Sequence, residues 1–235
     1  MNHSGNLPEQ TRGNMFSPEH GQAGGHCPGT WLPRPRQANM LRRVSHQIAD
    51  TERIARSGHA GAIVWLTGLS GSGKSTLAMN LERKLFDAGF MVYVLDGDNL
   101  RHGLNSDLDF TPQSRRENVR RVGETAALFA DAGFVCIAAS ISPHAMDRDL
   151  ARSAAKGRPF FEFYLRADIA TCERRDPKGL YRLARSGRLR DFTGVDAPYD
   201  VPDAPDIVVD TVNQAIGTGV EHCFDFLSCR LRPLR

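Results

Sequence analysis

The sequence predicts a three-layer α/β/α sandwich built on a parallel central sheet. Five short apolar runs, rich in β-branched and aromatic residues, recur at residues 62–68, 91–98, 134–141, 160–165 and 206–211. Such runs are typical of strands buried on both faces of a parallel sheet. Helical segments alternate with them, which favours a doubly wound α/β domain. Ligands of such folds bind beyond the carboxyl ends of the strands, so we expect functional residues directly after each run.

Two of the predicted helices have defined ends. The first covers residues 74–88, and Gly89 provides a natural C-terminal cap directly after it. The second covers residues 112–132, where apolar side chains recur near helical spacing until Gly133 ends the pattern. Both helices lie between predicted strands, which is the alternation that the fold class requires.

The first 40 residues differ from the rest of the chain. They are rich in Gly, Pro, Asn and Gln and show no apolar periodicity. Such a composition cannot bury a core and is typical of disordered segments. We therefore expect residues 1–40 to form a disordered N-terminal arm and residues 41–235 to form the folded domain.

Composition excludes several classes of protein. The net charge of +3 does not suggest a nucleic-acid-binding protein, but it suits an anionic small substrate. No apolar run reaches the roughly 18 residues of a membrane span, and the N-terminus lacks a hydrophobic signal core. The cysteines form no CxxC pair, which predicts reduced thiols in a cytoplasmic protein. They are Cys27, Cys136, Cys172, Cys223 and Cys229.

A phosphate-binding loop follows the first predicted strand. The stretch GLSGSGKST contains the complete Walker A pattern, Gly68-x-x-x-x-Gly73-Lys74-Ser75, between a strand and a helix. Backbone N–H groups and the helix N-terminus would hold the phosphates of a nucleoside triphosphate. Lys74 would reach the β- and γ-phosphates, and Ser75 would supply a hydroxyl to Mg²⁺. The predicted nucleotide-binding residues are Gly68, Leu69, Ser70, Gly71, Ser72, Gly73, Lys74, Ser75 and Thr76.

Three classes of protein use this loop, and the sequence favours a small-molecule kinase. A regulatory GTPase would carry an NKxD stretch, which the sequence lacks. The DxxG match at residues 176–179 follows the fourth strand, too late for that class. A motor or transport ATPase would carry further signatures such as an LSGGQ-type stretch, which is also missing. We therefore interpret residues 41–235 as a kinase domain of the P-loop NTPase type.

Two carboxylates close the second strand, where an acceptor pocket is expected. Asp96 and Asp98 lie in the stretch LDGD at the end of the apolar run. One of them can help to hold Mg²⁺ through water, and the other can accept the proton of an acceptor hydroxyl. Either carboxylate could instead cap the turn that follows. The sequence leaves the assignment of these roles open.

Arginines follow the same strand on the ligand side. Arg101 comes shortly after the two carboxylates, and Arg115 shares a helix face with Asn118 because the two lie three residues apart. Two arginines here suit a second anion on the acceptor rather than a neutral sugar. We interpret the neighbouring Arg116 and Arg120 as a solvated surface.

Two later segments complete the predicted pocket. Ser142 follows the third strand, and Pro143 at a first helical position indicates that this serine caps a helix and can also bind ligand. Residues 176–199 are basic, Gly-punctuated and short of apolar periodicity, which favours a mobile lid over an ordinary surface insertion. Phe110 and Phe192 stand in polar segments, so either can stack on a purine, although a core role stays open.

Taken together, these motifs resemble the adenylyl-sulfate kinase (APS kinase) family. The stretches GLSGSGKST, LDGDNLRHGLN, FTPQSRRENVRRVGE, ISP, DPKGLY and FTGVDAPYD occur in the family's order and spacing, from about residue 43 to residue 210. The resemblance implies transfer of the γ-phosphate of ATP to the 3′-hydroxyl of adenosine 5′-phosphosulfate. The product would be 3′-phosphoadenosine 5′-phosphosulfate (PAPS), made in sulfate activation and assimilation. A purine, a second anion and a reacting hydroxyl agree with the pocket inferred from the residues.

The resemblance also implies roles for individual residues. Asp98 would lie near the reacting hydroxyl and Mg²⁺, and Phe192 would stack on the acceptor's adenine. Ser142 matches the family's phosphoserine position, although direct in-line transfer from ATP needs no phosphoenzyme. The implied catalytic residues are Asp98, Lys74 and Ser142. The implied acceptor-binding residues are Asp96, Asp98, Arg101, Phe110, Arg115, Asn118, Ile141, Ser142 and Phe192.

The resemblance implies a homodimer, because members of the family are commonly dimeric. The sequence leaves open whether a sulfurylase binds this chain, and whether the product feeds sulfate reduction or sulfation. Two alternatives also stay open: a kinase of another phosphorylated or nucleoside acceptor, and a nucleotide-binding regulator without turnover. The intact residues of the site argue against the regulator, namely Lys74, Ser75, Asp96 and Asp98.

Four positions depart from the family's pattern. Ala145 stands where arginine is frequent, Ser114 where aspartate is common, and Asp109 where glycine is frequent. Asp200 ends the FTGVDAPYD stretch, where glutamate is usual. None of the four belongs to the phosphate-binding loop or to the pair of predicted carboxylates. They bear on acceptor affinity and lid dynamics rather than on the reaction.

Overall fold

The computed structural model describes residues 44–232, and the predicted arm at residues 1–40 lies outside them. The five predicted strands are confirmed as β1 (Ala62–Thr67), β2 (Val92–Asp96), β3 (Val135–Ala139), β4 (Phe160–Arg166) and β5 (Ile207–Asp210). All of them pair in parallel, in the order β2-β3-β1-β4-β5.

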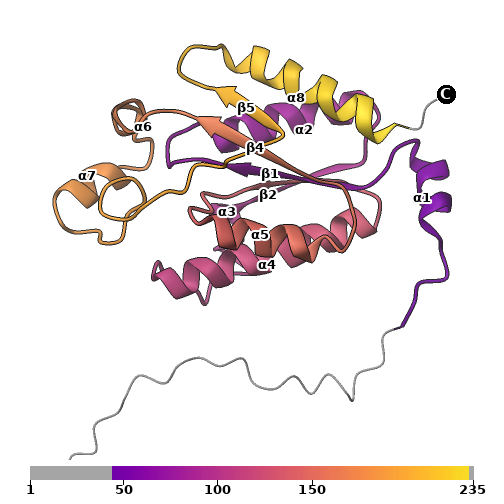
Figure 1. Cartoon of the computed structure of the whole chain (residues 1–235), viewed down its shortest axis with the longest axis horizontal. Helices are drawn as coiled ribbons and strands as arrows, with labels where there is room; N and C mark the ends of the chain where they lie inside the picture. The colour runs from indigo at the N-terminus through magenta and orange to yellow at the C-terminus, as the bar shows by residue number, and fades with distance from the viewer. Residues whose placement is uncertain (1–43, 233–235) are drawn as a thin grey trace, which may run out of the picture. The chain divides into compact units, whose positions relative to one another are not determined.

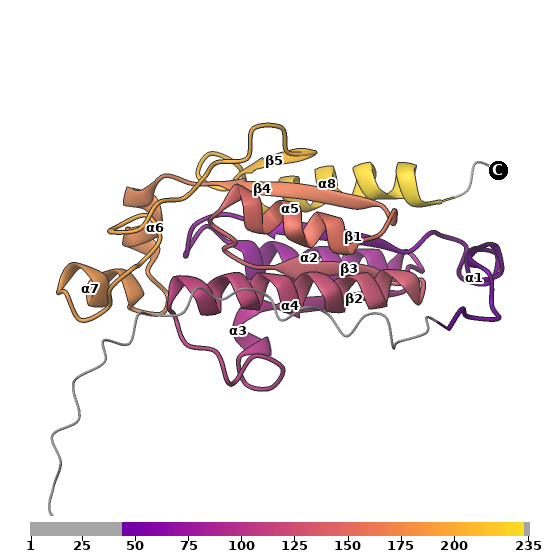
Figure 2. The ribbon, with the colours of Figure 1, turned by 60° about the horizontal axis from the view of Figure 1, so that its bottom comes forward.

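Helices cover both faces of this sheet (Figures 1 and 2). On one face α2 (Lys74–Asp87) packs beside α8 (Ile216–Leu231), and on the other α4 (Pro112–Asp131) packs beside α5 (Ala145–Ala154). The shorter helices are α1 (Asp50–Ser57), α3 (Gly97–Leu100), α6 (Ile169–Arg175) and α7 (Leu180–Arg185). The predicted three-layer α/β/α sandwich is therefore confirmed.

Each face of the sheet has an apolar core of its own. Every residue of β1 is buried, and successive side chains point to opposite faces. Val64 and Leu66 join the cluster beneath α2 and α8, whereas Ile63 and Trp65 join the cluster beneath α4 and α5. A strand covered on both sides gains burial free energy from every side chain. This explains why the strands are nearly continuous apolar runs rather than alternating ones.

The two helices with predicted ends begin and end within one residue of expectation. α4 begins at Pro112 because Thr111 caps it, accepting a hydrogen bond from the Ser114 N–H at 3.3 Å. Proline fits this position because the first helical N–H has no partner within the helix. Gly133, two residues beyond the end of α4, has φ +99°, which favours glycine.

The start of α5 differs from the prediction. The helix begins at Ala145 rather than at Pro143, and its N-cap residue is His144, without a side-chain capping hydrogen bond. The prediction that Ser142 caps this helix is therefore wrong. Ser142 instead lies in the loop between β3 and α5, where its hydroxyl has other partners.

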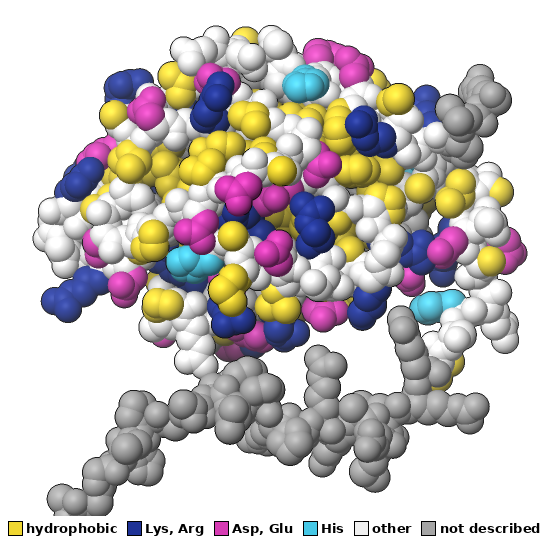
Figure 3. Space-filling model, in the orientation of Figure 1, with side chains coloured by type: hydrophobic (Ala, Val, Ile, Leu, Met, Phe, Trp, Pro, Cys, Tyr) yellow, Lys and Arg dark blue, Asp and Glu magenta, His cyan; other side chains and the backbone are white. Residues whose placement is uncertain are grey.

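The strand order brings the predicted functional segments to one end of the sheet. β3 lies between β1 and β2, so the residues that follow these three strands meet at their common carboxyl edge. The chain that carries α6 and α7 lies at the same end in Figures 1 and 2. In the described range, 44–232, no helix is long and apolar enough to cross a membrane. Figure 3 shows basic and acidic side chains interspersed over the viewed face, in keeping with the mild net charge of +3.

Candidate active site

A cavity of about 700 Å³ opens at the carboxyl ends of the strands. Its walls come from the phosphate loop after β1, the residues after β2 and β3, and the lid segment, which we define as residues 176–199. Small-molecule sites typically occupy about 300–1,000 Å³. The cavity therefore has the size of a ligand site and lies where the fold class predicts one.

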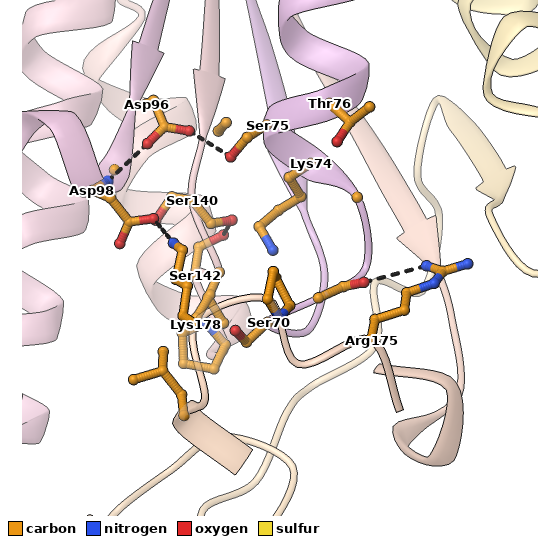
Figure 4. A pocket seen from close by; sticks show the side chains of 18 of the residues that line it. Ser70, Lys74, Ser75, Thr76, Asp96, Asp98, Ser140, Ser142, Arg175 and Lys178 are labelled. Atoms are coloured by element: carbon orange, nitrogen blue, oxygen red, sulfur yellow. Dashed lines mark hydrogen bonds and ion pairs between the residues drawn. The ribbon is translucent and has the colours of Figure 1, made fainter. Parts of the chain in front are cut away.

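The phosphate loop holds Lys74 inside the cavity (Figure 4). Its ammonium donates hydrogen bonds to the carbonyl oxygens of Gly68 at 2.9 Å and Leu69 at 2.7 Å. Burial lowers the pKa of Lys74 to about 8, because the charged form loses its hydration. A bound phosphate would stabilise this charge, so the loop is prepared for an anion.

The backbone of the loop requires glycine at the positions that the Walker A pattern specifies. Gly68 has φ +151° and Gly73 has φ +95°, and a Cβ at Gly68 would lie 2.7 Å from the carbonyl oxygen of Leu165. Six of the nine predicted nucleotide-binding residues line the cavity, namely Ser70, Gly71, Gly73, Lys74, Ser75 and Thr76. The other three are not part of its lining, namely Gly68, Leu69 and Ser72.

Asp96 caps a helix, which was one of the roles expected of it, and its carboxylate also bonds the phosphate loop. Its Oδ1 accepts hydrogen bonds from the backbone N–H groups of Asp98 at 3.0 Å and Asn99 at 3.4 Å, which caps α3. Its Oδ2 accepts a hydrogen bond from the Ser75 hydroxyl at 2.6 Å. The two carboxylate oxygens thus serve the helix and the phosphate loop at once.

Asp98 lies on α3, and its carboxylate contacts the lid segment. Its carboxylate forms an ion pair with the ammonium of Lys178, and both side chains are about half exposed (Figure 4). Exposed pairs contribute only about 0–1 kcal/mol, so this one can exchange partners readily. Sequence reasoning placed Lys178 in the predicted lid but did not assign it a role of its own. Its place in the DPKGLY motif is the signal that could have revealed it.

Two arginines and a phenylalanine form the opposite wall. The Arg101 guanidinium lies 4.3 Å from the centroid of the Phe110 ring. Arg115 donates hydrogen bonds to the Phe110 carbonyl at 2.8 Å and to the Thr193 hydroxyl at 3.0 Å. Partial burial lowers the pKa of the Arg115 guanidinium from a very high ordinary value, so it stays charged. This wall carries two cations toward the cavity, as a second anionic ligand requires.

Asn118 lines the same wall, and the face that it shares with Arg115 is turned toward the cavity. The Nδ2 group of Asn105 donates a hydrogen bond to the Asn118 Oδ1 at 3.0 Å. Asn105 is fully buried and holds this amide in place. The Asn118 Nδ2 group is therefore the end left to donate a hydrogen bond to a ligand.

Ile141 and Ser142 form the cavity wall that follows β3. Ser142 is 1% exposed and has φ +40°, an unusual backbone conformation for a residue other than glycine. Its hydroxyl accepts a hydrogen bond from Trp65 Nε1 at 3.0 Å and donates one to Thr67 Oγ1 at 3.1 Å. The hydroxyl is engaged inside the protein, so its visible function is to anchor this loop.

The lid segment has a small core, which its sequence pattern did not predict. Tyr181 on α7 is fully buried and packs edge-on against Phe192, with ring centroids 4.9 Å apart. Tyr181 also donates a hydrogen bond from its hydroxyl to the Ser70 carbonyl at 3.0 Å. Phe192 is 4% exposed and belongs to this core, and it also lines the cavity.

Arg175 is a further cation of the cavity that sequence reasoning did not single out. It lies at the end of α6, directly before the DPKGLY stretch. Its guanidinium donates hydrogen bonds to the Gly71 carbonyl and to the Thr211 hydroxyl, both at 3.2 Å. Arg175 thus joins the phosphate loop to the chain that follows β5.

Two of the four departures from the family's pattern lie against each other. The Ala145 N–H donates a hydrogen bond to Asp200 Oδ2 at 3.0 Å, and the Asp200 N–H donates one to the Pro143 carbonyl at 2.8 Å. The aspartate therefore binds backbone groups at the N-terminus of α5 directly. This contact ties the residue that directly follows the lid segment to the wall that follows β3.

These features define a class of protein. A phosphate loop with a buried lysine faces, across one cavity, a wall of arginines, an aromatic ring and a carboxylate. The lid segment contributes a lysine and a phenylalanine to the same cavity. This is the arrangement of a P-loop kinase that phosphorylates a small anionic acceptor.

Comparison with known proteins identifies the family. The sequence profile described as adenylylsulphate kinase matches residues 60–210. The chain is 49% identical over 195 residues to the adenylyl-sulfate kinase of Geotalea daltonii, a match that covers 82% of this chain and 96% of that relative. This chain therefore belongs to the adenylylsulphate kinase family, and it is an ATP-dependent phosphotransferase.

Solved structures agree with this assignment. The APS kinase CysC of Mycobacterium tuberculosis, determined in complex with AMPPNP and APS, superposes with a TM-score of 0.70 at 48% identity. The match covers 72% of this chain and 98% of that chain. The hexameric APS kinase from Thiobacillus denitrificans superposes with a TM-score of 0.58 at 29% identity, covering 76% of this chain and 31% of that chain.

Proposed function

We propose that this chain transfers the γ-phosphoryl group of ATP to the 3′-hydroxyl of adenosine 5′-phosphosulfate and so forms PAPS. The observation that carries the proposal is the single cavity that joins the phosphate loop to the wall of Arg101, Phe110 and Arg115. An acceptor with a phosphosulfate group and a purine matches two cations and aromatic rings in charge and shape. The activity of the family to which the chain belongs supports the same acceptor.

The phosphate loop would hold the triphosphate of ATP. The ammonium of Lys74 would donate hydrogen bonds to the β- and γ-phosphates, either in place of its two carbonyl partners or in addition to them. Arg175 bonds the backbone of the same loop and would stabilise its conformation beside the phosphates. Phosphoryl transfer depends mainly on positioning and on charge stabilisation, which these cations would supply.

Mg²⁺ fits the oxygen atoms beside the loop. The Ser75 hydroxyl and the Asp96 carboxylate lie 2.6 Å apart, and hard oxygen ligands of this kind suit the ion. Residues 44–232 contain no cluster of three or more His, Cys, Asp or Glu side chains that could hold a metal. This agrees with an ion held mostly by substrate phosphates and water. When bound, Mg²⁺ would neutralise charge on the transferred phosphoryl group.

We propose that Asp98 is the group that accepts the proton of the reacting hydroxyl of the acceptor. The two oxygens of Asp96 already accept three hydrogen bonds, whereas Asp98 is exposed and forms an ion pair with the exposed ammonium of Lys178. Movement of Lys178 toward the phosphates would leave the Asp98 carboxylate to accept the proton of the 3′-hydroxyl. Arg101 and Arg115 would bind the phosphosulfate of the acceptor. Phe110 and Phe192 would stack on its adenine. Asn118 and Ile141 would complete its pocket.

We propose direct in-line transfer without a phosphoserine at Ser142. The Ser142 hydroxyl is buried and bonded to Trp65 on one side and to Thr67 on the other. Phosphorylation would remove the hydrogen that Ser142 donates to Thr67 and place a dianion among buried groups, which is costly. Incubation with γ-labelled ATP in the absence of acceptor tests this, because a stable label on the protein would contradict it.

A coupled assay of ADP release tests the main proposal. Mg-ATP is supplied with adenosine 5′-phosphosulfate and, in a matched control, with AMP, which lacks the sulfate. We expect rapid turnover only with the sulfated nucleotide, and loss of that turnover in Lys74→Ala. Turnover with a different acceptor would favour another small-molecule kinase. ATP binding without any turnover would favour a nucleotide-binding regulator.

The assembly and location of the chain are further proposals. A homodimer is expected from the resemblance, and light scattering on the purified chain measures its mass directly. A sulfurylase partner is tested by co-elution of the two proteins. The described cysteines are all free thiols, namely Cys136, Cys172, Cys223 and Cys229, which suits the reducing cytoplasm.

A further inference from the structure

Arg148 is a buried cation that the proposed reaction does not use. It lies on α5, is 4% exposed, and is not part of the cavity lining. Its Nε donates a hydrogen bond to Glu162 Oε1 on β4 at 2.7 Å. A charge that is withdrawn from water so completely is retained only with good partners, so its other contacts indicate its function.

The remaining contacts of Arg148 are with the cavity wall. One guanidinium nitrogen donates hydrogen bonds to the carbonyl oxygens of Ser142 at 3.0 Å and Pro143 at 3.3 Å. Ser142 has φ +40°, which persists in a residue other than glycine only where the surroundings hold it. Arg148 supplies this hold from behind the wall, on the side away from the cavity.

Other buried side chains hold the same wall from β1. Trp65 and Thr67 bond the Ser142 hydroxyl, and Thr67 also donates to the Ile141 carbonyl at 2.8 Å. The Tyr199 hydroxyl lies 3.0 Å from Thr67 Oγ1, and the Arg148 guanidinium lies 6.0 Å from the centroid of the Tyr199 ring. The side chains of β1 hold the Ser142 hydroxyl and the Ile141 carbonyl, and Arg148 holds the carbonyls of Ser142 and Pro143.

We propose that Arg148 is a positioning residue for the acceptor, which rests on the proposed function of the site. Arg148 joins Glu162 to the carbonyls of Ser142 and Pro143. In this way it fixes the position of the part of the wall that would contact the acceptor. A guanidinium can serve these partners together because its donors form a planar fork. A lysine at this place keeps the charge beside Glu162 but has a single nitrogen, so it cannot hold the wall in the same way.

Arg152 provides a matched control. It lies one turn further along α5, 3.5 Å from the other oxygen of Glu162, and its guanidinium lies over the Phe160 ring. It also donates to the Phe160 carbonyl at 3.1 Å, but it has no hydrogen bond to the wall. Its substitution therefore perturbs the same carboxylate without removing contacts to the Ser142 and Pro143 carbonyls.

The first experiment compares the kinetics of Arg148→Lys and Arg152→Lys. For R148K we expect the KM for adenosine 5′-phosphosulfate to rise about tenfold while the KM for ATP changes less than about twofold. For R152K we expect both constants to stay within about twofold of the wild type. An unchanged acceptor KM in R148K would overturn the proposal. Equal rises for both substrates would show a merely structural role and would overturn it as well.

A second readout does not depend on turnover. The chain has two tryptophans, so Trp31→Phe leaves Trp65, whose indole N–H bonds the wall, as the single indole signal in an NMR spectrum. In this background we expect hydrogen exchange of that N–H to accelerate about tenfold in R148K and to stay unchanged in R152K. Unchanged exchange in R148K would contradict positioning. If the wild type does not phosphorylate adenosine 5′-phosphosulfate, the proposed function fails, whereas this exchange still shows whether Arg148 holds the Ser142 wall.

Discussion

At the scale of single residues, burial decides which groups of the site are available for chemistry. Lys74 is buried and has a pKa lowered to about 8 by the loss of hydration. Asp96 is also buried, and its oxygens are committed to Ser75 and to the start of α3. Asp98 remains exposed beside Lys178. Two aspartates only two residues apart therefore reach different roles through their surroundings.

The lowered pKa of Lys74 predicts a pH dependence of ATP binding. Below about pH 8 the ammonium is charged and ready for phosphate, whereas above it the free protein increasingly holds neutral lysine. ATP favours the charged form, so binding above this pH requires uptake of a proton and grows weaker as pH rises. Calorimetry at pH 7 and pH 9, in buffers of different ionisation enthalpy, measures both effects. Equal affinity and no proton uptake at the two pH values would contradict the prediction.

The substitution Arg115→Ala is expected to weaken acceptor binding selectively. Loss of a charge-assisted contact with the acceptor costs about 1.5–3 kcal/mol, or roughly ten- to a hundredfold in affinity. ATP affinity should change little, because Arg115 lies on the opposite wall from the phosphate loop. Arg116→Ala is the matched control, since that neighbouring side chain is 60% exposed and pairs with Asp147. The affinity of each nucleotide is measured by direct binding. Equal losses of affinity for ATP and for the acceptor in Arg115→Ala would show that the acceptor pocket lies elsewhere.

At the scale of elements, the lid segment contacts both halves of the cavity. Tyr181 on α7 donates a hydrogen bond to the Ser70 carbonyl in the phosphate loop, and the Thr193 hydroxyl accepts one from Arg115 on the acceptor side. Further along, Asp200 bonds the backbone at the start of α5. The segment is therefore fixed at several points, and the ion pair between Lys178 and Asp98, near the start of the segment, is an exposed contact. Ligands bound in the cavity can therefore separate Lys178 from Asp98 at a small cost in free energy.

The substitution Tyr181→Phe tests the first of these fixed points. It removes the hydroxyl that bonds Ser70 but keeps the ring that packs against Phe192, so the lid core should persist. One hydrogen bond is worth about 1 kcal/mol, which predicts a KM for ATP raised about fivefold. Tyr199→Phe removes a hydroxyl that lies beside Thr67, behind the acceptor wall, and should leave the KM for ATP unchanged. The reverse pattern in steady-state kinetics would show that Tyr181 does not support the phosphate loop.

At the scale of the whole molecule, strand order assembles the site. The phosphate loop, the two aspartates and the Ser142 wall are far apart in sequence, and they converge because β3 separates β1 from β2. Two apolar cores, one on each face of the sheet, keep this edge rigid. We propose that the folded domain carries all of these features and that residues 1–40 are dispensable for them.

Deletion of residues 1–40 is expected to leave the domain folded and active. Both cores and the full cavity lining lie within residues 62–231. The melting temperature should therefore stay within about 2 °C of that of the full chain, which corresponds to less than roughly 1 kcal/mol. Calorimetry and the ADP-release assay on both proteins measure stability and turnover. A large fall in melting temperature would show that this segment stabilises the domain.

By itself the sequence determined the class of fold, the phosphate loop and the ends of α2 and α4. These features rest on local chemistry: apolar runs that only a doubly covered strand can bury, glycines that a phosphate loop needs, and a Thr-Pro cap. Resemblance then pointed to the family that the comparisons show.

Only the tertiary structure decided how side chains from distant segments share the site. It gave Asp96 and Asp98 different partners, replaced the predicted capping contact of Ser142 with buried hydrogen bonds, and revealed the contacts of Lys178 and Arg148. None of these outcomes follows from local patterns, because each depends on partners that come from other strands or helices. Burial and hydrogen bonding between such segments set the function of a polar side chain, and they exist only once the sheet has brought the segments together.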